Sequence, residues 1–366
     1  MGGIERIVSD LSRTLMKREE VSKVSILTTK ANFPTGSFDY LPSFYSCDNL
    51  DVYRINFFPK TIPFFYHSYN AGFFSKDLYK TIEIISPDII HMCKIEWYIP
   101  NYLIVKKFSN TCKLICFSSY HKKEIKVKHF PMIVICNYIY ERVNYVHVPT
   151  NALRNEMLST FCIEEDKLKV VPNPLETISP LDFRYDKSPK IKTLISIARF
   201  EKNKQQLELI RALRKIPKHL VKDFRLILIG TDGGTLNAIN HLLKDQKIEN
   251  VFVKENVTDV EKKRLLSFAD IYLNTSLSEA FSLATAEAMM FGLPILSFNI
   301  ETVYELTRGK ALYADQMNWD DFIKKLTLLL ENVELRSELG KAMKEVSSEF
   351  LSMEKYTDEI IRLYIN

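Results

Sequence analysis

One stretch of this 366-residue sequence decides the fold: SLSEAFSLATAEAMMFGLP, residues 276–294. Between Phe281 and Phe291 the only charged residue is Glu287, in a segment that is otherwise apolar or small on nearly every side. This pattern predicts a helix that is buried against a sheet. Because burial of an unpaired carboxylate is costly, Glu287 needs partners. These are either hydroxyls of a ligand or a cation of the protein in a structural ion pair.

Short apolar runs alternate with helical segments on both sides of this stretch, which predicts parallel, doubly wound sheets. In the second half we expect strands at 192–198, 225–230, 251–253, 271–274 and 294–297, and helices at 204–215, 236–245, 259–268 and 281–291. In the first half we expect strands at 24–28, 52–55, 88–91, 113–117, 145–148 and 169–171.

The predicted fold is α/β, with two Rossmann-like, doubly wound domains that face a central cleft. We expect an N-terminal domain at 1–180 and a C-terminal domain at 190–350, because four prolines between 172 and 189 interrupt any periodic pattern. A last helix within 351–366 is long enough to cross back to the first domain.

The composition excludes several classes of protein. Lys+Arg 50 against Asp+Glu 45 gives a net charge of +5, which is too balanced for a nucleic-acid coat protein and makes a nucleic-acid partner an unfavoured reading. The six cysteines form no C-x-x-C pair, so a structural zinc site is not expected. No apolar run reaches the ~18–20 residues that span a bilayer. We expect a cytoplasmic protein, soluble or peripheral at the cytoplasmic face of the membrane.

The start of the 281–291 helix is a candidate anion site. Glu279 precedes it and follows the predicted strand 271–274, where doubly wound sheets bind their ligands. The free amides of Phe281, Ser282 and Leu283 would carry the partial positive charge of a helix N-terminus, which favours phosphate.

A second helix start repeats this arrangement with cations. Arg199 lies at a predicted strand end and Lys204 at the beginning of the next helix, and together they could neutralise a diphosphate. Taken singly, Arg199 or Lys204 could also be a solvated surface cation. For the neighbouring Lys202, a solvated surface cation is the better interpretation. The glycine-rich run 230–234 is not G-x-G-x-x-G and is weak evidence by itself.

These features occur in one order along the chain. Arg199-x4-Lys204 is followed by Glu279-x7-Glu287 with Phe281 and by Gly292-Leu-Pro294, and the sequence opens with Gly2-Gly-Ile-Glu-Arg. In this combination the chain resembles the retaining glycosyltransferases of family four, which have the GT-B fold. The resemblance extends over nearly the whole sequence.

The resemblance implies a role for each matching position. Glu287 would bind the ribose hydroxyls of a nucleotide-sugar, Glu279 would lie beside the donor sugar, and Arg199 and Lys204 would grip the diphosphate. His121 would lie near the reaction centre, although a surface histidine is an equal reading. The implied catalytic residues are Glu279, His121, Arg199 and Lys204; the implied donor-binding residues are Gly3, Arg199, Lys204, Glu279, Phe281, Ser282, Leu283 and Glu287.

The resemblance further implies transfer of a sugar from a nucleotide-diphosphate-sugar to a glycan or lipid-linked acceptor, with retention of configuration. No D-x-D occurs, so we expect metal independence and no cofactor. The aromatic run 56–74 suits a first-domain core or, together with the nearby lysines of 122–128, an acceptor groove or a membrane-facing surface. Two other readings stay open: a GT-B-fold sugar-nucleotide epimerase and a non-catalytic sugar-nucleotide-binding protein.

The sequence departs from the family pattern in three places. Gln205 and Ser282 stand where glycines are common, and Met1 directly precedes the Gly2-Gly3 turn, so the usual first strand is missing. We therefore expect a gap or an unpaired edge at the centre of the first-domain sheet, and a start of the native chain upstream of Met1.

Overall fold

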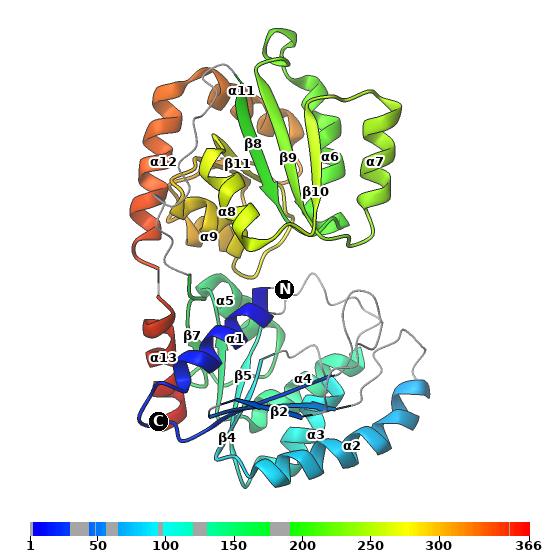
Figure 1. The fold of residues 1–366 in the computed structure, drawn as a ribbon, viewed down its shortest axis with the longest axis vertical. Helices are drawn as coiled ribbons and strands as arrows, with labels where there is room; N and C mark the ends of the chain where they lie inside the picture. Colours follow the sequence, from blue (N-terminus) through cyan, green and yellow to red (C-terminus); the bar gives the residue numbers. More distant parts are fainter. Residues whose placement is uncertain are drawn as a thin grey trace. The chain divides into compact units, whose positions relative to one another are not determined.

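The computed structural model describes residues 3–29, 44–47, 49–55, 65–93, 98–119, 130–175, 191–350 and 352–366. The chain forms two compact units (Figure 1). Unit 1 comprises residues 1–149, 153–174 and 353–366, and unit 2 comprises residues 150–152 and 175–352.

Unit 2 is built on a six-stranded sheet in which every pairing is parallel. The strand order is β10-β9-β8-β11-β12-β13. The strands are β8 (Lys192–Ile197), β9 (Phe224–Gly230), β10 (Val251–Glu255), β11 (Ile271–Asn274), β12 (Ile295–Phe298) and β13 (Leu312–Ala314).

Helices cover both faces of this sheet, because successive strand residues point to opposite sides. In β9, Leu226 and Leu228 pack with α6, α7 and α11, whereas Ile227 and Ile229 pack with α8, α9 and α12. Figure 1 shows the two helical layers on either side of β8, β9 and β10. The helices are α6 (Gln206–Ala212), α7 (Leu236–Asp245), α8 (Asp259–Phe268), α9 (Leu283–Met290), α10 (Glu301–Leu306), α11 (Trp319–Glu331) and α12 (Val333–Ser347), with short 3-10 turns at Lys202–Lys204, Leu213–Lys215 and Lys218–Leu220.

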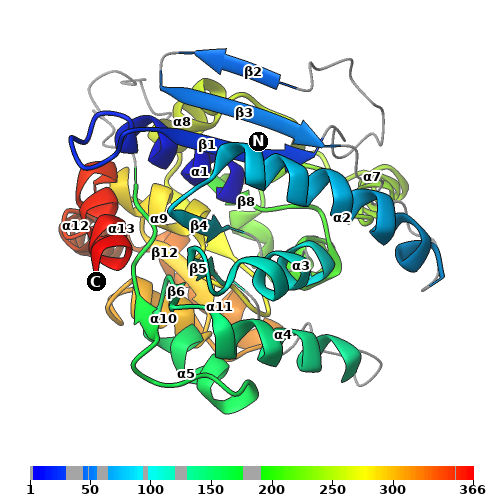
Figure 2. The ribbon, with the colours of Figure 1, turned by 90° about the horizontal axis from the view of Figure 1, so that it is seen from below.

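Unit 1 carries two sheets, which Figure 2 shows. One has the order β1-β3-β2 and the other the order β4-β5-β6-β7. The strands are β1 (Val24–Thr29), β2 (Phe44–Cys47), β3 (Leu50–Ile55), β4 (Ile89–Met92), β5 (Lys113–Phe117), β6 (Tyr145–Val148) and β7 (Leu168–Val170). Within the described residues, β1 pairs only with β3 and β4 pairs only with β5. The strand β2, which the sequence did not predict, runs antiparallel to β3.

The last helix of the chain packs in unit 1, as the predicted fold required. It contacts α1 and β5, and Arg18 pairs with Asp358 at 2.5 Å. Lys113 Nζ donates to the carbonyl of Tyr364 at 3.1 Å. The helices of this unit are α1 (Gly3–Leu15), α2 (Phe65–Ile85), α3 (Tyr98–Phe108), α4 (Phe130–Arg142), α5 (Asn151–Thr160) and α13 (Met353–Ile365).

Two histidines, of which His147 is fully buried, meet where α13 contacts the β4–β7 sheet. His91 Nε2 is 2.9 Å from His147 Nε2, and His91 Nδ1 is 2.9 Å from Tyr364 Oη. Burial lowers the pKa of His91 from 6.5 to about 4, and burial together with His91 lowers the pKa of His147 well below its usual value. Both rings are therefore neutral at pH 7.

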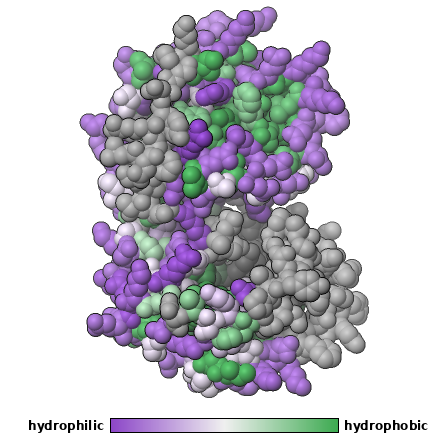
Figure 3. Space-filling model, in the orientation of Figure 1, coloured by the Kyte–Doolittle hydropathy of each residue, from purple (hydrophilic) through white to green (hydrophobic). Residues whose placement is uncertain are grey.

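The visible face of the molecule is mostly hydrophilic, with hydrophobic side chains in smaller groups (Figure 3). Among the helices that the structure describes, none combines the length and hydropathy that a membrane span requires.

Candidate functional site

The predicted site residues of unit 2 gather at the carboxyl ends of β8 and β11. These two strands are neighbours, and the chain leaves β8 toward β9 and β10 on one side and places β11, β12 and β13 on the other. This is the topological switch point of the sheet, where open α/β folds bind their ligands.

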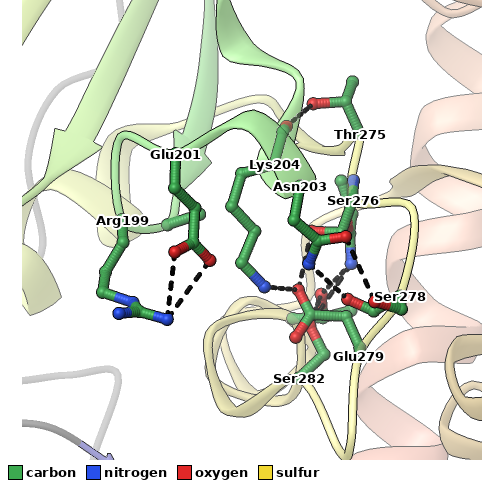
Figure 4. Close-up of polar contacts among 12 residues, drawn as sticks. Arg199, Glu201, Asn203, Lys204, Thr275, Ser276, Ser278, Glu279 and Ser282 are labelled. Carbon is green, nitrogen blue, oxygen red and sulfur yellow. Dashed lines mark hydrogen bonds and ion pairs between the residues drawn. The ribbon is translucent and has the colours of Figure 1, made fainter. Parts of the chain in front are cut away.

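Lys204 and Glu279 form the centre of the site. Lys204 Nζ lies 2.9 Å from Glu279 Oε1, and both side chains are mostly buried, at 13% and 16% exposure. Ser276 Oγ donates to the same carboxylate oxygen at 2.7 Å. Figure 4 shows the lysine reaching across from the β8 side to the loop that follows β11. The two residues that the sequence placed at separate helix starts therefore meet directly.

Arg199 points to the same region but is paired with Glu201, which the sequence analysis did not single out. Its Nη2 is 3.1 Å from Glu201 Oε2 and 3.3 Å from Oε1, and 67% of its side chain is exposed (Figure 4). The buried amide of Gln206 holds the backbone here, because its Nε2 donates to the carbonyls of Ala198 and Arg199. The guanidinium is thus exposed while its backbone is fixed.

The glycine-rich run 230–234 supports this segment. A Cβ on Gly230 would lie 2.0 Å from the carbonyl oxygen of Ala198, and one on Gly233 would lie 3.0 Å from Glu201 Cβ. Phe200 pairs with Asp232 in a parallel bridge, and its carbonyl accepts from the amide of Gly233. The glycines at 230 and 233 allow close packing of the β9 turn against residues 198–201.

Four hydrogen bonds besides the Lys204–Glu279 contact join the loop that carries Lys204 to the loop that carries Glu279. Asn203 Nδ2 donates to the Ser278 carbonyl and Ser278 Oγ donates to Asn203 Oδ1, both at 3.1 Å. Thr275 Oγ1 donates to the Lys204 carbonyl at 2.7 Å, and the Leu277 amide donates to the Asn203 carbonyl at 2.9 Å. These short polar residues gave no signal of their own in the sequence, because their partners lie more than 70 positions away.

The helix after Glu279 begins later than predicted. Ser282 has φ 67° and ψ 64°, so α9 starts at Leu283 rather than at Phe281. The side chain of Phe281 is 5% exposed and packs in the core, while Ser282 Oγ binds Thr285 and buried Asn274. The side chains of Phe281 and Ser282 are therefore engaged within unit 2. Leu283 N, at the first helical position, has no intrahelical acceptor.

Glu287 pairs with a cation of the protein, which is the second of the two kinds of partner expected for it. Lys262 Nζ on α8 lies 2.7 Å from Glu287 Oε1, and the two side chains are 16% and 14% exposed. The cation was missed because its identity depends on how α8 packs beside α9. Burial raises the pKa of Tyr272 on β11, and the charges of Glu279 and Glu287 raise it further. Both carboxylates therefore act on the same phenol.

Two predicted residues belong to unit 1. Gly3 is the first residue of α1, and His121 lies outside the described residues, as do the lysines of 122–128. The aromatic run 56–74 is described only from Phe65, as the first half of α2.

Two protein-family models match consecutive parts of the chain. The family model "Glycosyltransferase Family 4" matches residues 1–178, and "Glycosyl transferases group 1" matches residues 179–346. Trehalose synthase of Thermococcus litoralis is 23% identical over 222 residues, covering 55% of this chain and 53% of that protein. N-acetyl-alpha-D-glucosaminyl L-malate synthase of Bacillus anthracis is 28% identical over 193 residues, covering 51% and 49%. The chain thus spans about half the length of the curated relatives it matches.

Solved structures resemble the chain over its full length. Sucrose-phosphate synthase from Thermosynechococcus elongatus has a TM-score of 0.79 at 15% identity, covering 99% of this chain and 93% of that one. Anabaena Alr3699/HepE, solved in complex with UDP-glucose, has a TM-score of 0.72 at 15% identity, covering 100% and 96%. At these identities the similarity establishes the fold. Together with the two family models, it shows that the chain belongs to the family 4 glycosyltransferases of the GT-B fold.

Proposed function

We propose that this protein transfers a sugar from a nucleotide-diphosphate-sugar to a glycan or lipid-linked acceptor, with retention of configuration and without a metal ion. The observation that carries the proposal is the Lys204–Glu279 pair at the switch point of the unit 2 sheet, with Arg199 beside it. A cation pair at this place in the fold matches the charge of a diphosphate. The UDP-glucose held by the HepE structure supports a donor of this class.

The chemistry defines what these residues must do. Breaking the bond between the sugar C1 and the diphosphate oxygen leaves the electron pair on that oxygen. The acceptor hydroxyl oxygen bonds to C1, and its proton passes to the leaving diphosphate. Negative charge grows on the leaving group, so cations and amides aimed at it lower the barrier. Arg199 would contribute a planar fork, Lys204 a point charge and Leu283 an amide at the start of α9.

The carboxylates have separate roles in this proposal. Glu279, held by Lys204 and Ser276, would face the donor sugar, whose C1 gains positive charge as the bond breaks. Glu287 would accept hydrogen bonds from the ribose hydroxyls. His121 of unit 1 would act on the acceptor side, and a membrane surface would be the place where a lipid-linked acceptor is met.

Donor hydrolysis tests the proposal. The purified chain is incubated with UDP-, GDP- and ADP-sugars, and release of free sugar and nucleoside diphosphate is followed without acceptor and with glycan or lipid-linked acceptors. We expect slow hydrolysis of one donor and faster turnover with a suitable acceptor, and the product should keep the anomeric configuration. Binding of a nucleoside diphosphate with no cleavage of any donor would favour a binding protein. Conversion of a nucleotide-sugar to its epimer, with the diphosphate intact, would favour an epimerase.

A further inference from the structure

Lys262 is a charged residue of unit 2 that the sequence analysis did not assign, and it contacts Glu287 of the proposed site. It lies in the second turn of α8, and its ammonium is 2.7 Å from Glu287 and 3.4 Å from Asp259. Asp259 is 61% exposed, whereas Glu287 is 14% exposed. The pairing with Glu287 is therefore the better shielded of the two and the stronger electrostatic contact.

One reading of this pair is a structural bond between α8 and α9. The packing of these helices is already supplied by apolar side chains, among them Leu265, Leu266 and Met289 in one buried cluster. The pair stays about one-seventh exposed, so a ligand atom could still reach it. A purely structural role would not require the carboxylate to stand on an otherwise apolar helix one turn after the start of α9.

The position of Glu287 also connects it to the site. Its charge acts on the phenol of Tyr272, on which the charge of Glu279 acts as well. Tyr272 lies on β11, the strand whose carboxyl end leads to Glu279. A carboxylate has about four lone-pair directions, so Glu287 can accept from Lys262 and from two ligand hydroxyls at the same time.

We propose that Lys262 is a positioning residue that holds Glu287 as the acceptor for the ribose hydroxyls of the donor, and so sets a preference for ribonucleotides over 2′-deoxyribonucleotides. The inference rests on the proposed function, in which Glu287 binds ribose. Lys262 fixes the direction of the carboxylate and neutralises it, so that the diphosphate approaches a site without an uncompensated negative charge. Without the Lys262 ammonium, Glu287 would be held less firmly and would recognise the 2′-hydroxyl less selectively.

The experiment measures binding of a ribonucleoside diphosphate and its 2′-deoxy form by isothermal titration calorimetry. The base is that of whichever of UDP, GDP and ADP the wild-type chain binds. We expect the wild type to prefer the ribo form by about tenfold or more, as for a charge-assisted hydrogen bond. Lys262→Met should reduce this preference to about threefold or less. Lys325→Met is the matched control, because it breaks a 2.7 Å ion pair with Asp321 of similar burial on α11 and should leave the preference unchanged.

The outcomes separate this inference from the proposed function. If Lys262→Met keeps the wild-type preference for the ribo form, the role of Lys262 is overturned while the proposed function stands. The same holds if Lys262→Met loses affinity equally for both nucleotides and has a lower melting temperature. If Lys262→Met does not fold, Lys262→Gln keeps a polar side chain without the charge. For Lys262→Gln, a preference for the ribo form below that of the wild type supports the inference, and an unchanged preference overturns it. A wild type that binds both forms equally contradicts the ribose contact of Glu287, and one that binds no diphosphate contradicts the proposed function; either result overturns the inference as well.

Discussion

Lys204 and Glu279, 75 positions apart in the sequence, meet with Nζ 2.9 Å from Oε1. Arg199 is paired in the same way with Glu201. Each cation that we propose for the diphosphate is thus paired with a protein carboxylate. In the proposed function, donor binding exchanges one anionic partner of each cation for another, and this exchange can be measured.

Glu201→Gln is expected to tighten binding of nucleoside diphosphate by a few-fold. Because Arg199 is largely exposed, its pair with Glu201 contributes at most about 1 kcal/mol, which corresponds to about fivefold in affinity. Calorimetry with the diphosphate measures the change. Glu208→Gln is the control, since it frees Arg211 from a similar exposed pair on α6. Weaker binding by Glu201→Gln would mean that Glu201 helps to orient Arg199 instead of competing with the ligand.

Turnover is expected to persist in excess EDTA, because the charge on the leaving diphosphate would be met by Arg199 and Lys204. The assay compares initial rates of donor cleavage with and without chelator, after which magnesium or manganese is added back. Rates within about twofold of each other are expected. Activity that is lost in EDTA and restored by either ion would show that the two cations are not sufficient.

Gln205→Gly is expected to stabilise unit 2 by about 1 kcal/mol and to raise its melting temperature by about 2–4 °C. Gln205 has φ 57°, in the left-handed region that favours glycine. The same substitution at Gln246, where φ is −102°, is the control and should destabilise, because it adds backbone freedom without relieving strain. Thermal unfolding followed by circular dichroism compares the two. Equal losses of stability would contradict the strain at Gln205.

Unit 1 is expected to lose stability as the pH falls from about 7 to 5. The pKa of His91 is lowered to about 4, so in this range the folded ring stays neutral while the unfolded ring takes up a proton. Protonation therefore favours unfolding, and the buried His147 acts in the same direction. The melting temperature should drop by about 4 °C or more across this range.

A double substitution of His91 and His147 by Gln should flatten this pH dependence. The exposed His241, changed to Gln, is the control and should leave the slope as it is in the wild type. A double variant with the wild-type slope would assign the pH dependence to other groups.

The sequence predicted most of unit 2 because its elements are single apolar or amphipathic runs with clear ends. The observed α7, α8 and β11 have the predicted bounds. The predicted 204–215 helix is interrupted where Gln205 turns left-handed, and α9 begins late because Ser282 does the same. These are the two positions at which a family glycine is replaced. The predicted helix limits were wrong here because Gln205 and Ser282 adopt the left-handed backbone conformation, which these residue types do not indicate.

Other features depend on contacts that no local pattern records. β2 was not predicted, since all four of its residues are exposed and give no alternation of polar and apolar positions. The need of Glu287 for a partner was predicted, but the choice of Lys262 depends on the packing of α8 beside α9. The pairing of Arg199 with Glu201 is local, yet neighbouring charges on a loop are usually solvated, so their contact carried no signal.

The return of α13 to unit 1 has a consequence for synthesis. A ribosome produces α1 first and α13 last of the helices described here, so the residues of unit 2 between them emerge before the helix that covers β5 and holds Tyr364 against His91. Unit 2 can therefore fold while translation continues, whereas unit 1 cannot be completed until α13 has been synthesised. During that interval the incomplete unit is the part that would need protection by chaperones.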